Sequence, residues 1–191
     1  MGKQPDVYAI ANEMERHDYT VRDDLLNIVG IRTSDMQANA FNDWLVLFYA
    51  HQGDWLSYAF PATTDPGLYY RHVPANVRGT AILKPGQYEG AYTVGRHRGY
   101  KALQQVGDLT VFRDDNRDSI LDYEGMEWET GLFGINIHRA SMYRTETDVG
   151  KWSAGCQVIQ DNYHWRFFIE LCERAHQERL TYTLLTDNFK K

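Results

Sequence analysis

The sequence predicts a mainly β domain that carries one C-terminal helix, built as a β-sandwich or a partly open barrel. Many short β-prone runs alternate with Gly, Pro and polar turns, which is typical of β architectures. Aromatic residues, which favour strands, make up 14% of the 191 residues. One long amphipathic helix pattern lies near the end of the chain. Short strands and a single helix bury their apolar faces most simply when the helix packs on the sheet.

The first third of the chain divides into an N-terminal extension, residues 1–24, and the start of a main domain that we expect to span residues 25–191. Apolar residues three and four positions apart predict a short helix over residues 6–17. Clustered β-branched and aromatic residues predict strands at residues 25–32, 43–50 and 55–60. A Gln-Gly-Asp turn separates the last two strands, so we expect them to form a hairpin.

The rest of the chain continues the β pattern and ends with the helix and one more strand. Strands are predicted at residues 80–83, 88–94, 109–113, 132–138, 154–159 and 181–186. Gly95 and Gly99 are expected to bracket a loop that carries His97. The helix is predicted over residues 162–179, because apolar side chains recur there at helical spacing. Asp161 or Asn162 can cap its first turn.

Composition and charge exclude several classes of protein. The formal net charge of −6 argues against a protein that binds duplex nucleic acid, which would need a basic stripe. No apolar run is long enough to insert into a membrane. The first residues contain no apolar segment of a secretory signal, so we expect synthesis in the cytoplasm. The two cysteines, Cys156 and Cys172, do not make a disulfide scaffold. We expect a monomer.

A histidine and a cysteine lie at the ends of two consecutive predicted strands, and this pair points to chemistry. A thiol becomes a useful nucleophile when an imidazole takes its proton. His138 ends one strand and Cys156 begins the next. Gly155 lets the backbone turn sharply, and the N–H groups of Gly155 and Cys156 could then form an oxyanion hole. Taken alone, the same pattern also fits a buried thiol and a surface histidine.

The pair resembles the signature of the L,D-transpeptidase (YkuD-type) family. In that family a strand-end His is followed, after a loop of similar length, by Ser/Thr-His-Gly-Cys. This chain offers His138 and then Ser153-Ala154-Gly155-Cys156. The resemblance covers about residues 80–160 and implies a β-rich fold with the cysteine in a cleft.

The resemblance also implies roles for individual residues. Cys156 matches the nucleophile, His138 the general base, and the carbonyl of Arg139 would orient the imidazole. Gly155 would help to hold the oxyanion, and Ser153 matches the Ser/Thr position beside the substrate. No cofactor is required for this chemistry.

Several positions depart from the family pattern, which affects the substrate more than the nucleophile. Ala154 replaces the second histidine, and Gln157 stands where an arginine usually follows the cysteine. His97 could supply the missing imidazole, although an exposed loop histidine is the simpler interpretation. Arg144 and Lys151 could bind a peptide carboxylate, and solvated loop charges explain them equally well.

The wider sequence resembles a group of phage-encoded and prophage-encoded proteins that look like cell-wall lytic enzymes. The stretches that carry this resemblance are residues 60–67, 79–88, 134–140 and 151–158. An endolysin is made in the host bacterial cytoplasm without a signal peptide and reaches the cell wall after release. The resemblance therefore implies bacterial peptidoglycan as the partner.

An acidic loop resembles the first half of an EF-hand calcium loop. Oxygen ligands alternate along it, as calcium coordination requires, in Asp114, Asn116, Asp118, the Ile120 carbonyl and Asp122. The usual glycine at the sixth position is Ser119, and the twelfth position is Gly125, so Glu124 or Glu127 would have to complete the set. A structural calcium ion and a solvated turn both remain open.

The leading hypothesis is a cysteine peptidase that cleaves amide bonds of peptidoglycan stem peptides or cross-bridges through an acyl-enzyme on Cys156. An L,D-transpeptidase would form the same intermediate and pass the acyl group to an amine. A non-catalytic wall-binding or virion structural module is the third hypothesis. A muramidase lacks support, because no carboxylate pair stands out. The sequence leaves open the bond cleaved and the host.

Overall fold

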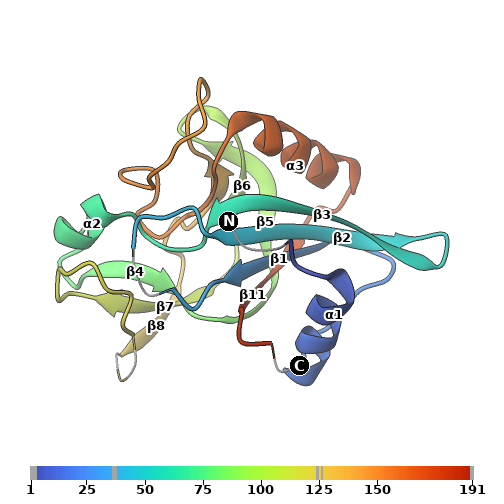
Figure 1. The fold of residues 1–191 in the computed structure, drawn as a ribbon, viewed down its shortest axis with the longest axis horizontal. Coiled ribbons are helices and arrows are strands. Elements are labelled where there is room, and N and C mark those ends of the chain that lie inside the picture. Colours follow the sequence, from blue (N-terminus) through green and yellow to red (C-terminus); the bar gives the residue numbers. More distant parts are fainter. Residues whose placement is uncertain (1–3, 36–37, 124, 126, 190–191) are drawn as a thin grey trace.

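The computed structural model describes residues 4–35, 38–123, 125 and 127–189. In this part of the chain, eight strands form one closed barrel, and each strand pairs with the next in a continuous ladder (Figure 1). The strands, in order around the barrel, are β1 (Asn27–Arg32), β11 (Leu180–Thr186), β5 (Gly86–His97), β6 (Tyr100–Gln105), β9 (Ile137–Arg139), β10 (Gln157–Ile159), β3 (Asp54–Thr63) and β2 (Asp43–His51).

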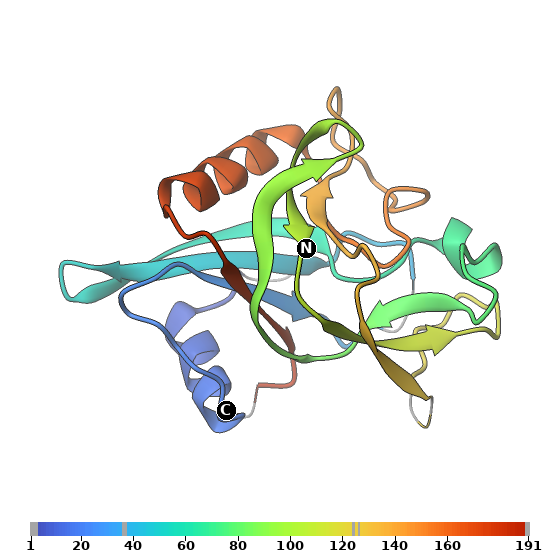
Figure 2. The same ribbon diagram turned by 180° about the vertical axis from the view of Figure 1, so that it is seen from behind.

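The join between β6 and β9 is the narrowest in the barrel, because a single residue pair, Leu103 with Ile137, connects the two strands. By contrast, nine residue pairs join β2 and β3 along their hairpin. Figure 2 shows the long β5 strand bending around the barrel beside β11. The mainly β prediction is confirmed, but the ladder closes completely where a sandwich or a partly open barrel was predicted.

A second sheet of three strands lies at one end of the barrel. It contains β4 (Thr80–Leu83), β7 (Leu109–Asp114) and β8 (Trp128–Gly131), with β7 in the middle. The short helix α2 (Leu68–His72) lies at the same end of the molecule (Figure 1). This end also carries the cleft and the acidic loop described below.

Two longer helices cover the barrel on opposite sides of β1 and β2 (Figure 1). The apolar face of α3 (Asn162–Arg174) joins the main core through Trp165, Phe168 and Ile169. The other helix, α1 (Val7–Arg16), packs on the outer face of the same strands. Successive residues of a strand point to opposite faces. Ile28 therefore faces the main core and Val29 faces α1, which explains why β1 is buried along its whole length.

Helix termini follow ordinary capping chemistry. The Asp6 carboxylate accepts hydrogen bonds from the N–H groups of Tyr8 and Ala9 at the start of α1. Asp161 does the same at the start of α3. The α3 helix ends at Arg174 rather than at residue 179 as predicted, because His176 adopts a left-handed conformation with φ of 51°. In the described part of the chain, none of the helices has the length and apolar character needed to cross a bilayer.

Most predicted strands are present, and the β2–β3 hairpin is confirmed. One prediction fails at residues 132–138, where only Ile137–Arg139 forms a strand. The backbone N–H groups of Phe133 and Ile135 instead donate to the side-chain oxygen of Gln105, each at 3.0 Å. A second prediction fails at His97, which ends strand β5 and does not lie in a loop. The strands β6 and β8 and the helix α2 were not predicted.

Candidate active site

Cys156 lies directly before β10, and His138 lies on β9, the parallel strand that pairs with β10. Gln157 of β10 pairs with Ile137 of β9, and Val158 pairs with His138. Val158 and His138 therefore face the same side of the strand pair, and Cys156 precedes Val158 by two residues. Cys156 is half-buried, whereas only 2% of His138 is exposed.

A backbone carbonyl determines which nitrogen of His138 carries the proton. The Nδ1 atom lies 2.8 Å from the carbonyl oxygen of Arg139, which can only accept a hydrogen bond. Nδ1 therefore carries the hydrogen and Nε2 is the basic nitrogen. Nε2 is buried and has no hydrogen-bond partner among the described residues. The contact expected of the Arg139 carbonyl is thus present. It leaves Nε2 of His138 unprotonated and free to accept a proton.

Two further side chains surround the His138 imidazole. The Tyr100 hydroxyl lies 3.2 Å from Nδ1 and 3.5 Å from the Arg139 carbonyl, so it can donate to the same oxygen. The His97 ring stacks on His138, with ring centroids 4.2 Å apart. Burial lowers the pKa of His138 to about 3, and the nearby His97 adds to this shift. The imidazole is therefore neutral in the free protein.

His97 is held by Asn136. The Asn136 oxygen accepts a hydrogen bond from the backbone N–H of Gln105 at 2.9 Å, which fixes the orientation of the amide. The amide nitrogen must then donate to Nδ1 of His97, 3.0 Å away. His97, which the sequence offered as a replacement imidazole, thus lies directly against the candidate base.

The thiol of Cys156 is neutral in the free protein. Burial raises its pKa to about 11, and a hydrogen bond from the Asn136 backbone offsets this only in part. The sulfur lies 3.7 Å from the Gly134 carbonyl, which makes a weak thiol hydrogen bond. Cys156 and His138 are therefore both uncharged, and the site does not hold a resting thiolate–imidazolium pair.

The turn before Cys156 requires glycine. Gly155 has a φ of +123°, and a Cβ atom there would lie 2.6 Å from the Ala81 carbonyl oxygen. Its N–H group donates to Ser153 Oγ at 3.1 Å, and that hydroxyl donates to the Cys156 carbonyl at 2.7 Å. The Gly155 N–H was expected to be an oxyanion donor, but it is already engaged. Among the described residues, the Cys156 N–H has no acceptor and is the available donor.

Two expected substrate-binding residues face the protein interior instead. Ser153 is fully buried and holds the turn through the two hydrogen bonds just described. Gln157 is fully buried inside the barrel, where its oxygen accepts from the Tyr182 hydroxyl at 2.8 Å. Its amide nitrogen donates to the carbonyls of Thr64 and Gly155 at 3.3 and 3.2 Å. Both side chains are buried here and anchor the Cys156 turn, so their predicted contact with substrate stays a prediction.

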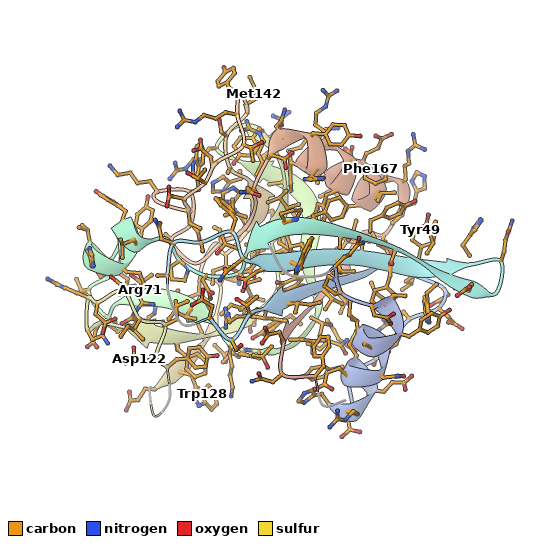
Figure 3. The ribbon with its side chains drawn as sticks, viewed as in Figure 1. Tyr49, Arg71, Asp122, Trp128, Met142 and Phe167 are labelled. Carbon is orange, nitrogen blue, oxygen red and sulfur yellow. The ribbon has the colours of Figure 1, made fainter. Side chains whose placement is uncertain are left out.

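The two expected loop cations also lie away from the cysteine and histidine. Arg144 is exposed and pairs with Glu146 at 3.0 Å. The Lys151 ammonium lies 4.1 Å from the centre of the Tyr69 ring. Neither contacts Cys156 or His138 among the described residues. Figure 3 shows Met142, from the same loop, at its outer tip.

A cleft of about 350 Å³ opens beside Cys156. One wall comes from β4 and the segment before it, and the other from the irregular segment before β9. The lining side chains and backbone belong to Ala75, Asn76, Gly79, Thr80, Ala81, Arg113, Leu132, Phe133, Gly134, Ile135, Ala154 and Cys156. Sequence reasoning missed Arg113, because a single arginine in a strand forms no recognisable motif.

The acidic loop is organised around an arginine and not around a metal site. The Arg71 side chain is completely buried, and its Nε lies 2.6 Å from Asp114 Oδ2. Its Nη2 lies 3.2 Å from Asp118 and donates to the Ile120 carbonyl. Arg71 of α2 thus takes the contacts of the first, third and fourth ligands that a calcium ion would need. Figure 3 places Arg71 and Asp122 at the same end of the molecule.

The other acidic-loop side chains are also engaged among themselves. Asn116 donates to Asp122 at 3.2 Å, so these two side chains pair with each other. The described residues contain no group of three or more acidic, His or Cys side chains placed to hold a metal. Glu127 is exposed, and Glu124 lies outside the described residues.

Comparisons of this chain with protein-family models, with curated proteins and with solved structures gave no match.

Proposed function

We propose that this protein is a cysteine peptidase that cleaves amide bonds in bacterial peptidoglycan. The observation that carries the proposal is the state of His138. Its Nδ1 hydrogen is held by the Arg139 carbonyl, and its Nε2 is bare, buried and unpartnered on the strand adjacent to Cys156. Leaving a buried nitrogen unpaired costs stability, so such a group is expected where it has a chemical task.

The proposed reaction begins from neutral groups. Cys156 loses its thiol proton to Nε2 of His138 as the sulfur attacks the substrate carbonyl carbon. The Cys156 N–H supports the oxygen of the tetrahedral intermediate. The C–N bond then breaks, and His138 returns the proton to the leaving amine. Water attacks the resulting thioester, His138 takes a proton from this water, and the thiol recovers its hydrogen as the acid product leaves.

The choice of peptidoglycan as substrate rests on the resemblance to L,D-transpeptidases and to phage lytic enzymes. The cleft beside Cys156 is consistent with a peptide, because about 350 Å³ falls within the usual range of small-ligand sites. The cleft also explains how a half-buried thiol could meet an extended substrate.

Digestion of purified peptidoglycan by the wild-type protein and by Cys156→Ala tests the proposal, with the products identified by mass spectrometry. We expect Cys156-dependent release of peptide fragments. A product joined to an added D-amino acid would instead identify a transferase. Absence of both products from several wall types, with a folded protein, would contradict an enzymatic role.

A further inference from the structure

The cleft beside Cys156 has an uneven distribution of charge. Most of its lining is apolar or uncharged, and among the described residues Arg113 is the one charged side chain that lines it. Arg113 lies on β7, the central strand of the three-stranded sheet. A substrate bound against Cys156 therefore meets one guanidinium group.

Arg113 is held in place by three contacts. Its Nε lies 2.6 Å from Glu129 Oε1, and its Nη1 donates to the Gly79 carbonyl at 3.3 Å. The guanidinium carbon lies 5.2 Å from the centre of the Phe133 ring. Nη2 has no hydrogen-bond partner in the described part of the chain. A guanidinium whose plane is already fixed loses little further freedom when it binds a carboxylate.

The ion pair with Glu129 does not neutralise this positive charge. Arg78 also pairs with Glu129, with 2.5 Å between Nη1 and Oε2. Two guanidinium groups thus share one carboxylate, and one positive charge remains. Both arginines lower the pKa of Glu129. Asp115 and Glu127 line a separate groove of about 570 Å³, which shares only Arg113 with the cleft among the described lining residues.

We propose that Arg113 is a specificity-determining residue that selects peptide substrates with a free carboxylate near the scissile amide. This inference rests on the proposed function. The Nη2 hydrogens donate to the substrate carboxylate, and Glu129 with Phe133 keeps the guanidinium plane in position. A substrate whose carboxylate is converted to a carboxamide loses the charge-assisted part of this contact.

The test compares stem peptides that carry free carboxylates with the same peptides in amidated form. The wild-type protein should cleave the carboxylate form with a kcat/KM about 10- to 100-fold higher, mainly through KM, as expected for a hydrogen bond to a charged group. Arg113→Gln should cleave both forms at the rate that wild type shows for the amidated form. Arg113→Lys keeps the charge without the planar fork and should retain part of the preference.

Arg78→Gln is the matched control, because Arg78 shares Glu129 but does not line the cleft. It removes the surplus positive charge but leaves the Arg113 Nη2 hydrogens in the cleft, so it should keep a weaker preference for the carboxylate form, whereas Arg113→Gln should lose the preference. Equal cleavage of both forms by wild type, or an unchanged preference in Arg113→Gln, would overturn the inference.

A binding experiment separates failure of this inference from failure of the proposed function. If no peptide is cleaved, calorimetric binding of the same peptide pair to Cys156→Ala tests the cleft without any reaction. Tighter binding of the carboxylate form that disappears in Cys156→Ala/Arg113→Gln would support Arg113 even so. Equal or absent binding of the two forms would reject it.

Discussion

The imidazole rings of His97 and His138 lie face to face, with centroids 4.2 Å apart and planes within 7° of each other. Two protonated rings at this separation would repel, so each ring disfavours a charge on the other. Burial acts in the same direction and lowers the pKa of both groups. The stack therefore keeps His138 available as a base over a wide range of pH.

The first prediction concerns stability in acid. His138 has a pKa of about 3 in the folded protein and about 6.5 in an unfolded chain. Below pH 6.5 the unfolded state binds a proton that the folded state does not, so stability is full above pH 6.5 and is lost as the pH falls toward 3. The loss should approach about 1.4 kcal/mol per pH unit.

Urea unfolding at a series of pH values measures this dependence. His138→Gln should show a shallower fall in unfolding free energy between pH 6.5 and 4 than wild type does. His51→Gln, at an exposed position, should keep the wild-type slope. Equal slopes in wild type and His138→Gln would mean that His138 is protonated normally in the folded protein.

The second prediction concerns the reactivity of the free thiol. Because the pKa of Cys156 is raised to about 11, its alkylation by iodoacetamide should be slow at pH 7 and rise about tenfold per pH unit up to pH 10. Mass spectrometry can follow the Cys156 peptide, with the buried Cys172 as an internal control that stays unlabelled. A rate that reaches a plateau below pH 8 would reveal a thiolate–imidazolium pair instead.

Slow alkylation would not decide between an enzyme and a binding module. The proposed reaction forms the thiolate only during attack on the substrate, so a neutral resting thiol fits both. Product analysis decides the question, and the alkylation curve decides the charge state.

The third prediction concerns Arg71 and calcium. Arg71→Met leaves the buried Asp114 without its ion-pair partner, which should lower the unfolding free energy by about 3–5 kcal/mol. Arg71→Met/Asp114→Leu removes both charges and should recover part of this loss. Arg144→Met breaks only an exposed pair and should have no measurable effect.

Calcium should not stabilise the wild-type protein, because Arg71 occupies the contacts that the ion would need. Thermal unfolding with millimolar calcium, and with a chelator, should give the same midpoint. A calcium-dependent rise in the midpoint of wild type would show that the loop binds the ion despite Arg71.

The fourth prediction concerns the turn at Gly155. Gly155→Ala should reduce both stability and any Cys156-dependent activity, because its Cβ would meet the Ala81 carbonyl at 2.6 Å. Gly99→Ala is the control, since Gly99 also has a positive φ but has no atom within 4 Å of the added Cβ. That control should lose only about 1–2 kcal/mol from backbone strain. Equal losses in the two variants would show that the turn can shift.

Local sequence patterns predicted the elements that depend on local chemistry. The β2–β3 hairpin follows from two β-prone runs around a Gln-Gly-Asp turn, and α3 follows from apolar residues at helical spacing. The segment before β9 could not be predicted, because its backbone hydrogen bonds go to Gln105, about thirty residues earlier in the sequence. The residue pattern of the segment gives no indication of a hydrogen-bond partner this distant in the sequence.

The candidate site was predictable only where a motif specified it. Cys156, His138 and the Arg139 carbonyl follow from the resemblance, and the structure brings them to adjacent strands. The inward direction of Gln157 depends on the barrel, which the sequence did not define. Arg71 was missed for the same reason: it lies more than forty residues before the loop that it neutralises.

The hydrogen bond from Tyr182 to Gln157 ties the Cys156 turn to the last strand of the barrel. Strand β11 lies between β1 and β5 and pairs with both. During synthesis, residues 180–186 leave the ribosome after every other strand of the barrel. Until they arrive, β1 and β5 each have an open edge and the turn before the thiol lacks its anchor. The turn that carries the thiol therefore gains its anchor only when β11 has joined β1 and β5 and closed the barrel.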